Sequence, residues 1–74
     1  MKRYFFHLRD GREFERDEYG SVLPSDAAAV RQAVRLFHRT LGEAKETRPF
    51  AGLVLHVEDQ RGRTIVRVPF TAVH

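Results

Sequence analysis

The sequence contains no cysteine, and no uninterrupted apolar run is longer than four residues. The missing cysteine excludes a disulfide framework, an iron–sulfur site and thiol catalysis, and it is typical of a reducing compartment. The short apolar runs exclude a transmembrane helix, and the N-terminal stretch lacks the long apolar region of a signal peptide. We therefore expect a cytoplasmic protein without a membrane-spanning segment.

Sequence signatures of catalysis are also missing. There is no G-x-S-x-G elbow, no phosphate-binding glycine loop and no G-x-G-x-x-G fingerprint. Ser21 and Ser25 are the only serines, and each has a turn or helix-cap role available. A chain of 74 residues also leaves little volume for a substrate pocket. We predict a protein that is not an enzyme and that has no catalytic residue and no cofactor.

The composition itself is that of an ordinary globular protein. Hydrophobic residues make up 42% and charged residues 31% of the chain, so one folded domain over residues 1–74 is expected. The formal net charge is +3, and the surplus comes mainly from residues 25–48. A surplus of this size permits an anionic partner without requiring one.

The N-terminal part of the chain predicts a β-hairpin. Residues 3–9 read as a strand, with Tyr4, Phe6 and Leu8 on one face and Phe5, His7 and Arg9 on the other. Asp10-Gly11 predicts a tight turn, because both residue types tolerate positive φ. Residues 12–17 would form the second strand, and their many charges are typical of a sheet edge.

A helix is predicted over residues 26–46, after a short extended lead-in at residues 21–24. Ser25 or Asp26 is a suitable N-cap, and Pro49 prevents the helix from continuing. Apolar residues at spacings of three and four define the expected buried stripe, which consists of Val30, Val34, Phe37, Leu41 and Ala44, widened by Ala33 and Leu36.

Two more strands are predicted at residues 53–58 and 63–70, joined by a turn in which Gly62 suits a bulge. In the first strand, Leu53, Leu55 and Val57 lie opposite to Val54, His56 and Glu58; in the second, Thr64, Val66, Val68 and Phe70 alternate with Ile65, Arg67 and Pro69. Pro69 cannot donate a hydrogen bond, so the last strand ends there or lies at a sheet edge.

The order of elements is therefore β-β-α-β-β. This order predicts an α+β fold of two layers, a four-stranded antiparallel sheet with one helix packed on one face. A right-handed crossover above the first strand favours the strand order 2-1-3-4. Order 2-1-4-3 is the competing arrangement.

One helix leaves the other face of the sheet uncovered. The candidate interface on that face consists of Phe5, His7, Val54, His56 and Ile65. Uncovered apolar clusters are typical of interfaces, and small domains often gain burial by oligomerising. We therefore predict a protein-interaction module that forms a homodimer through this face, with an unidentified protein as the other conceivable partner. The alternative is a half-polar, solvated face covered in part by Arg and Glu side-chain stems.

The histidines allow a metal hypothesis that we do not adopt. His7, His56 and Glu58 share the uncovered face, and two imidazoles and a carboxylate are possible zinc ligands. No H-E-x-x-H or comparable signature is present, so we expect no metal site. His38, on the polar side of the helix, and His74 are expected to be solvated.

The helix also carries a stripe of basic residues. Arg31, Arg35 and Arg39 follow one another at intervals of four, with His38 beside them. Such a stripe is a candidate contact for the phosphates of a nucleic acid. A solvated helix face is the simpler interpretation. Binding of nucleic acid is therefore the alternative function, and self-association is the preferred one.

Several short motifs taken together resemble one family. They are Arg3-Tyr4-Phe5-Phe6-His7, Asp10-Gly11, Asp17-Glu18-Tyr19-Gly20, Leu23-Pro24 ahead of an alanine-rich helix, and Val66-Arg67-Val68-Pro69-Phe70. Over nearly its whole length the chain is similar to the small bacterial proteins grouped as domain of unknown function 6894. The resemblance implies a stand-alone bacterial cytoplasmic protein, and it brings no activity, cofactor or catalytic residue.

Overall fold

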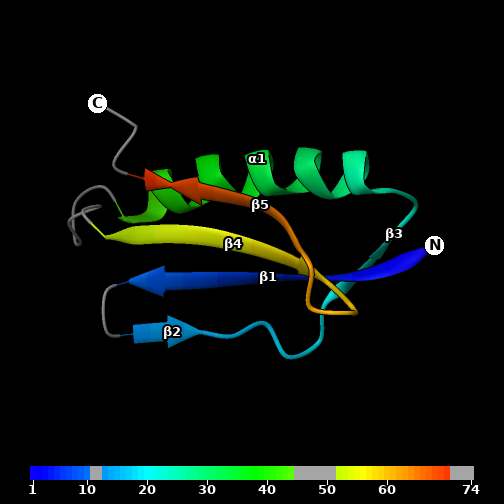
Figure 1. Cartoon of the computed structure of the whole chain (residues 1–74). Helices are drawn as coiled ribbons and strands as arrows, with labels where there is room; N and C mark the ends of the chain where they lie inside the picture. Colours follow the sequence, from blue (N-terminus) through cyan, green and yellow to red (C-terminus); the bar gives the residue numbers. More distant parts are fainter. Residues whose placement is uncertain (11–12, 45–51, 71–74) are drawn as a thin grey trace.

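A computed structural model describes residues 1–10, 13–44 and 52–70 of the chain. Its elements are β1 (Lys2–Asp10), β2 (Glu13–Glu15), β3 (Ser21–Leu23), α1 (Asp26–Ala44), β4 (Leu53–Asp59) and β5 (Thr64–Pro69). The strands form one antiparallel sheet, and α1 lies along one side of it (Figure 1). The predicted α+β fold of two layers is confirmed.

The sheet has one strand more than the sequence predicts. Its main order is β2-β1-β4-β5, which is the preferred order of the four predicted strands. The additional strand β3 is the predicted lead-in, and it pairs with the start of β1 while β2 pairs with the end of β1. The prediction of four strands was therefore wrong by this short segment, which returns to the sheet because the loop before it reverses the chain.

Gly20 makes that reversal possible. Its φ of 72° is in the left-handed region, which favours glycine. A Cβ atom at this position would lie 2.8 Å from the carbonyl oxygen of Tyr4, so a side chain would also collide with β1. The D-E-Y-G turn thus ends in a glycine because both the backbone angle and the close approach to β1 require it.

The N-terminus of α1 is capped as predicted. The Ser25 hydroxyl accepts a hydrogen bond of 3.2 Å from the Ala28 N–H, which identifies Ser25 as the N-cap of the two candidates. Asp26 lies in the first turn of the helix, where its charge suits the helix dipole.

The buried face of α1 differs from the predicted stripe. Ala29 and Ala33 are buried in the core, whereas Val30 and Val34 are 39% and 49% exposed. The small alanines allow the helix to approach the buried rings of Tyr4 and Phe70, and this contact turns the two valines outward. Leu36 and Phe37 pack against the core as predicted. The predicted stripe members Leu41 and Ala44 and the helix end at residues 45–46 lie outside the side chains and residues that are described.

A bulge in the last hairpin corrects a second prediction. Val57 pairs with Val66 but Glu58 pairs with Thr64, so Ile65 is the extra residue. Ile65 packs against the hydrophobic core, and its predicted place on the uncovered face is wrong. Thr64 takes that place, which moves it to the face opposite the one predicted.

The turn between β4 and β5 contains the glycine that the sequence predicts there. Gly62 has a φ of 82° in the turn before β5, as its predicted bulge role requires. The predicted turn glycine Gly11 and the helix-stopping Pro49 lie outside the described residues. Within the described residues, no helix is long and apolar enough to cross a membrane.

Candidate functional site

Two histidines lie at the centre of the helix-free face, the side of the sheet away from α1. His7 of β1 and His56 of β4 are direct cross-strand partners, and their ring centroids are 6.2 Å apart. The sequence predicted that they share this face, and this is confirmed. Only 4% of His7 and 5% of His56 is exposed, so they form the floor of the face and not its outermost surface.

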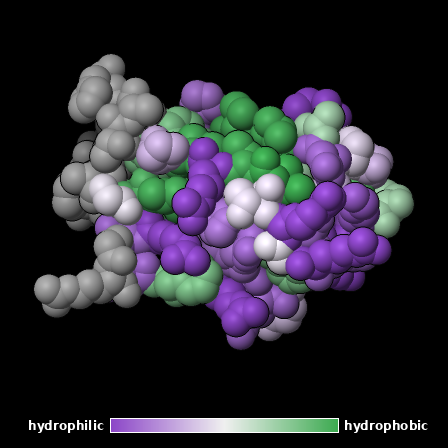
Figure 2. Space-filling model, in the orientation of Figure 1, coloured by the Kyte–Doolittle hydropathy of each residue, from purple (hydrophilic) through white to green (hydrophobic). Residues whose placement is uncertain are grey.

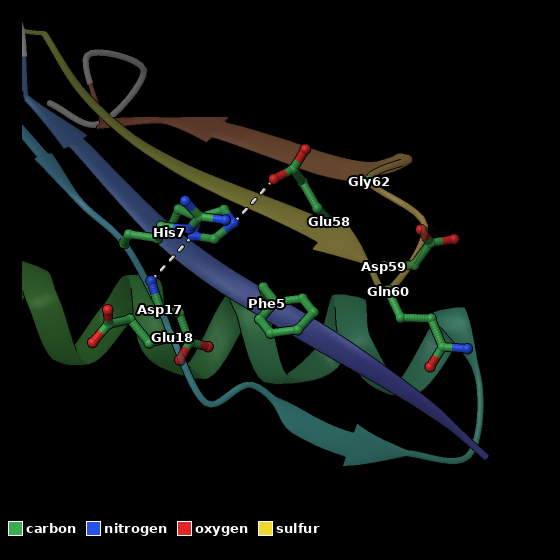
Figure 3. Close-up of a pocket in the computed structure, with 9 residues that line it drawn as sticks. Phe5, His7, Asp17, Glu18, Glu58, Asp59, Gln60 and Gly62 are labelled. Carbon is green, nitrogen blue, oxygen red and sulfur yellow. Dashed lines mark hydrogen bonds and ion pairs between the residues drawn. The ribbon is translucent and has the colours of Figure 1, made fainter.

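Both ring nitrogens of His7 have partners (Figure 3). The backbone N–H of Asp17 donates to Nδ1 over 3.1 Å, and Nε2 lies 3.0 Å from a carboxylate oxygen of Glu58. Because Nδ1 accepts a hydrogen bond, the ring proton of the neutral imidazole is on Nε2, which donates to Glu58. His7 therefore joins the loop that contains Asp17 to the neighbouring strand β4.

His56 is held less completely. Its Nε2 lies 2.9 Å from the hydroxyl oxygen of Thr64, and its Nδ1 is buried without a hydrogen-bond partner. Burial is the main cause that lowers the pKa of His56, and the Glu58 carboxylate opposes it only in part. The buried ring is therefore kept neutral, since a proton would place a poorly solvated charge inside the sheet.

Asp17 organises the loop beside His7. Its carboxylate accepts hydrogen bonds from the N–H groups of Phe6, Tyr19 and Gly20 at 3.0 to 3.2 Å. Burial alone would raise the pKa of Asp17, but these N–H donors together hold it below the usual value. Asp17 remains ionised and fixes the loop between β2 and β3 against β1.

A cavity of about 510 Å³ lies on the helix-free face, between the Asp17 loop and the β4–β5 turn. Residues of the loop, of β1 and of the β4–β5 turn line it, namely Phe5, His7, Arg16, Asp17, Glu18, Glu58, Asp59, Gln60 and Gly62. Asp59 is not available to a ligand, because it accepts bonds from the backbone N–H groups of Arg61 and Arg63 and from the Arg63 guanidinium. The Arg63 side chain is the main cause that lowers the pKa of Asp59 to about 2.

The polar groups around the cavity do not form a metal site. Within the described ranges, no group of three or more His, Cys, Asp or Glu residues is placed to hold a metal ion. In this arrangement His7 uses both ring nitrogens within the chain, and Glu58 accepts a hydrogen bond from one of them.

The accessible part of the helix-free face is mixed in character. Phe5 and Val54 are half-buried, and Phe14 of β2 is exposed. The guanidinium of Arg9 lies 4.5 Å from the centre of the Phe14 ring, a cation–π contact. Arg67 and Thr64 are exposed on the β5 side. The face thus combines aromatic and aliphatic surface with charges of both signs.

The basic stripe of the helix lies on the opposite layer. Arg31, Arg35, His38 and Arg39 are all exposed, as predicted. Arg35 donates to the side-chain oxygen of Gln32 over 3.1 Å. In the part of the chain that is described, no ion pair involves the three arginines. The prediction that this stripe contacts an anion stays a prediction.

Three residues that shape this face were not predicted from the sequence. Asp17 was predicted as an edge charge at the start of a turn over residues 17–20, but its capping of the N–H groups two and three residues on was not predicted. Phe14 was assigned to an edge strand without a role. Thr64 was placed on the wrong face, and no signal in the sequence marks the bulge that moves it.

Comparison with known families identifies the chain. A family model described as "Domain of unknown function (DUF6894)" matches residues 3–71, from the second residue of β1 to beyond β5. The chain belongs to the DUF6894 family. No curated protein and no solved structure matches it.

The DUF6894 match covers every described element from β1 to β5 and confirms the resemblance inferred from the motifs. The R-Y-F-F-H motif supplies the core residue Tyr4 and the face residues Phe5 and His7. The D-E-Y-G motif supplies the Asp17 loop and the Gly20 reversal. These family motifs thus build the fold and the helix-free face, while the family itself assigns no activity.

Proposed function

We propose that the chain is a non-enzymatic protein-interaction module whose working form is a homodimer, joined through the helix-free face. The observation that carries the proposal is the arrangement of opposite charges in rows across the strands. Glu58 shares a row with Phe5, Arg9 shares a row with Val54, and the His7–His56 pair lies between these rows. Neighbouring rows on one face are two residues apart, which is about 6.6 Å along a strand.

This arrangement favours a second copy as the partner. A twofold axis that crosses the strands at the histidine row exchanges the two outer rows. The Glu58 row of one copy then faces the Arg9 row of the other, and the symmetry repeats the contact. A face of one sign would repel its own copy, whereas opposite charges in these positions complement each other.

The apolar part of the face would supply most of the attraction. Phe5, Val54 and Phe14 offer aromatic and aliphatic area that association would remove from water. Aromatic residues and arginine are enriched in interface cores, and Arg9 already stacks on Phe14. The histidines below them provide a rigid floor that association need not order.

The absence of catalysis is part of the proposal. General acid–base chemistry needs a titratable group within reach of a substrate. His7 and Asp17 are committed to hydrogen bonds within the chain, and His56 is buried beside Thr64. These bonds support an interaction surface more than a reaction centre.

Sedimentation equilibrium from about 10 to about 500 µM tests the homodimer. We expect Arg9→Glu and Glu58→Arg each to weaken association at least about tenfold, and the double variant to recover much of it. Arg31→Glu on the outer helix face makes the same charge change as Arg9→Glu and should leave association unchanged. Thermal unfolding of each variant identifies any loss caused by misfolding.

Two results would overturn the homodimer. One is a wild-type chain that remains monomeric over the whole concentration range. The other is a double variant no better than the single ones, which would show that the two charged rows do not meet.

A second candidate function is binding of nucleic acid through the outer face of α1. The favouring observation is that Arg31, Arg35 and Arg39 are exposed, with no ion pair to any described residue. They extend over about 12 Å at 1.5 Å per residue, enough to reach several phosphates of one strand.

A further inference from the structure

The strand β5 forms an open edge of the sheet. It has six residues and pairs with β4, and no other described strand pairs with it. At the opposite edge, β2 and β3 have only three residues each and are separated by the Asp17 loop. Among the described strands, β5 therefore offers the longer uninterrupted edge for pairing with a further strand.

An exposed apolar flank of α1 lies beside this edge. Phe37 stacks on Phe70, just beyond β5, at a centroid distance of 4.4 Å, which places this flank on the β5 side. Val30 and Val34 continue the flank toward the start of the helix, and both are exposed. Leu36, on the other flank, lines a groove with Phe6 and Leu8 of β1, so the two flanks face different strands.

Hydrophobic surface gathers at the same place. Figure 2 shows green residues over α1 and β5, in the orientation of Figure 1, while purple residues dominate over the lower strands. Ile65, Val66 and Val68 of β5 are half-buried and pack against the core there. The helix thus extends past the edge of the sheet and leaves apolar surface where one more strand would lie.

The exposed charged side chain of β5 itself is basic. Arg67 is exposed on β5 and Arg31 is exposed on α1. Among the described side chains of α1 and β5, the one carboxylate is that of Asp26, and it accepts a bond from the buried hydroxyl of Tyr4. Arg67 lies on the helix-free side of β5, opposite His56, so an acidic side chain of an added strand would meet a basic partner there.

We propose that the β5 edge, together with Val30 and Val34, binds an extended segment of a different protein as an added strand, and that this segment alternates apolar with acidic side chains. Backbone pairing satisfies the open edge, as in other cases of strand addition. Alternate side chains of the segment cover the valines, and the intervening ones lie on the side of Arg67. A second copy is disfavoured as the partner, because pairing of two β5 edges would bring the Arg67 side chains of the two copies toward each other.

The test uses a synthetic peptide of about eight residues, blocked at both ends, in which valine alternates with glutamate. Binding is followed by amide chemical shifts and by hydrogen exchange of the isotope-labelled chain. We expect the β5 amides to become protected and the signals of Val30 and Val34 to shift. A peptide with lysine in place of glutamate should bind at least about tenfold more weakly, and so should one with a central proline, which lacks a donor.

Matched variants identify the surface. Val34→Glu should weaken binding of the glutamate peptide, whereas Val22→Glu should leave it unchanged, because Val22 is 48% exposed but lies on β3. Arg67→Glu should shift the preference toward the lysine peptide. Because Arg67 is exposed, this variant tests the proposal even if Val34→Glu proves unstable.

Three outcomes would overturn the proposal. The first is no protection of the β5 amides at saturating peptide, and the second is equal binding of the glutamate and lysine peptides. The third is protection of the β5 amides that increases with protein concentration when no peptide is present. The last would make a second copy the occupant of the edge. The homodimer proposed above is tested instead by sedimentation equilibrium of the Arg9→Glu and Glu58→Arg variants, so the two proposals can fail independently.

Discussion

The hydroxyl of Tyr4 donates a hydrogen bond of 2.6 Å to the carboxylate of Asp26 and so joins the first strand to the first turn of the helix. Tyr4 is completely buried in the core. This bond, followed by burial, raises the pKa of Tyr4 to about 12. Because its pKa is raised in the fold, the protonated Tyr4 phenol contributes to the free energy of unfolding. This contribution is complete below pH 10 and is lost as the pH rises from about 10 to about 12.

The titration of Tyr4 provides the first prediction. Tyr19 is the other tyrosine, so in a Tyr19→Phe variant the tyrosinate absorbance reports Tyr4 alone. We expect a midpoint near pH 12, and a lower midpoint when Asp26→Asn is added, because the amide carries no charge. A midpoint that does not respond to Asp26→Asn contradicts the assigned cause.

Gly20 and Gly42 predict opposite effects of alanine. Gly20→Ala should lower the free energy of unfolding by about 2 kcal/mol or more, because the left-handed φ and the Tyr4 carbonyl both resist a Cβ atom. Gly42→Ala should raise it by about 0.5 to 1 kcal/mol, since this exposed helical glycine has nothing within 4 Å of a new Cβ. Urea unfolding measures both. Equal effects of the two substitutions would contradict the account of the loop.

Stability should depend on pH through His56. Its pKa is lowered in the fold, mainly by burial, so the unfolded chain binds the proton more readily. The free energy of unfolding should therefore rise as the pH increases toward the ordinary histidine pKa of about 6.5 and level off above it. Urea unfolding at several pH values measures this slope. The slope should be smaller in His56→Gln, and an unchanged slope would assign the dependence to other groups.

The outer face of α1 gives the prediction for nucleic acid. Replacement of Arg31, Arg35 and Arg39 by alanine should weaken binding to duplex DNA and reduce the salt dependence, with a slope smaller by up to about three units if each arginine meets a phosphate. A control variant with alanine at Lys2, Arg16 and Arg61 loses the same charge elsewhere. Mobility shifts at several salt concentrations separate the two variants. No mobility shift of the wild-type chain at low salt eliminates this function.

Local patterns in the sequence were sufficient for most of the fold. The alternation in residues 3–9 and 53–58 placed Tyr4 in the core and put His7 and His56 on the same far face, because a strand has a strict period of two. Ser25 before an alanine-rich stretch marked the helix start.

The candidate surfaces were less predictable. Val30 and Val34 looked like core residues, because periodicity shows which side of a helix is apolar but not how the helix is rotated on the sheet. Ile65 looked like a face residue because a bulge shifts the alternation by one position without any marker in the sequence. Because of these two errors, the sequence did not predict the exposed apolar surface at the β5 edge.

The chain's local chemistry determined that there would be two layers and that one side of the sheet would have no helix, whereas it left two strand orders open and the tertiary structure decided between them. The contacts between the layers determined the rest. Ala29 and Ala33 allowed α1 to approach Tyr4, and this approach set the rotation that exposes the valines. Packing of this kind depends on the shapes of side chains that are distant in sequence, so no local pattern contains it.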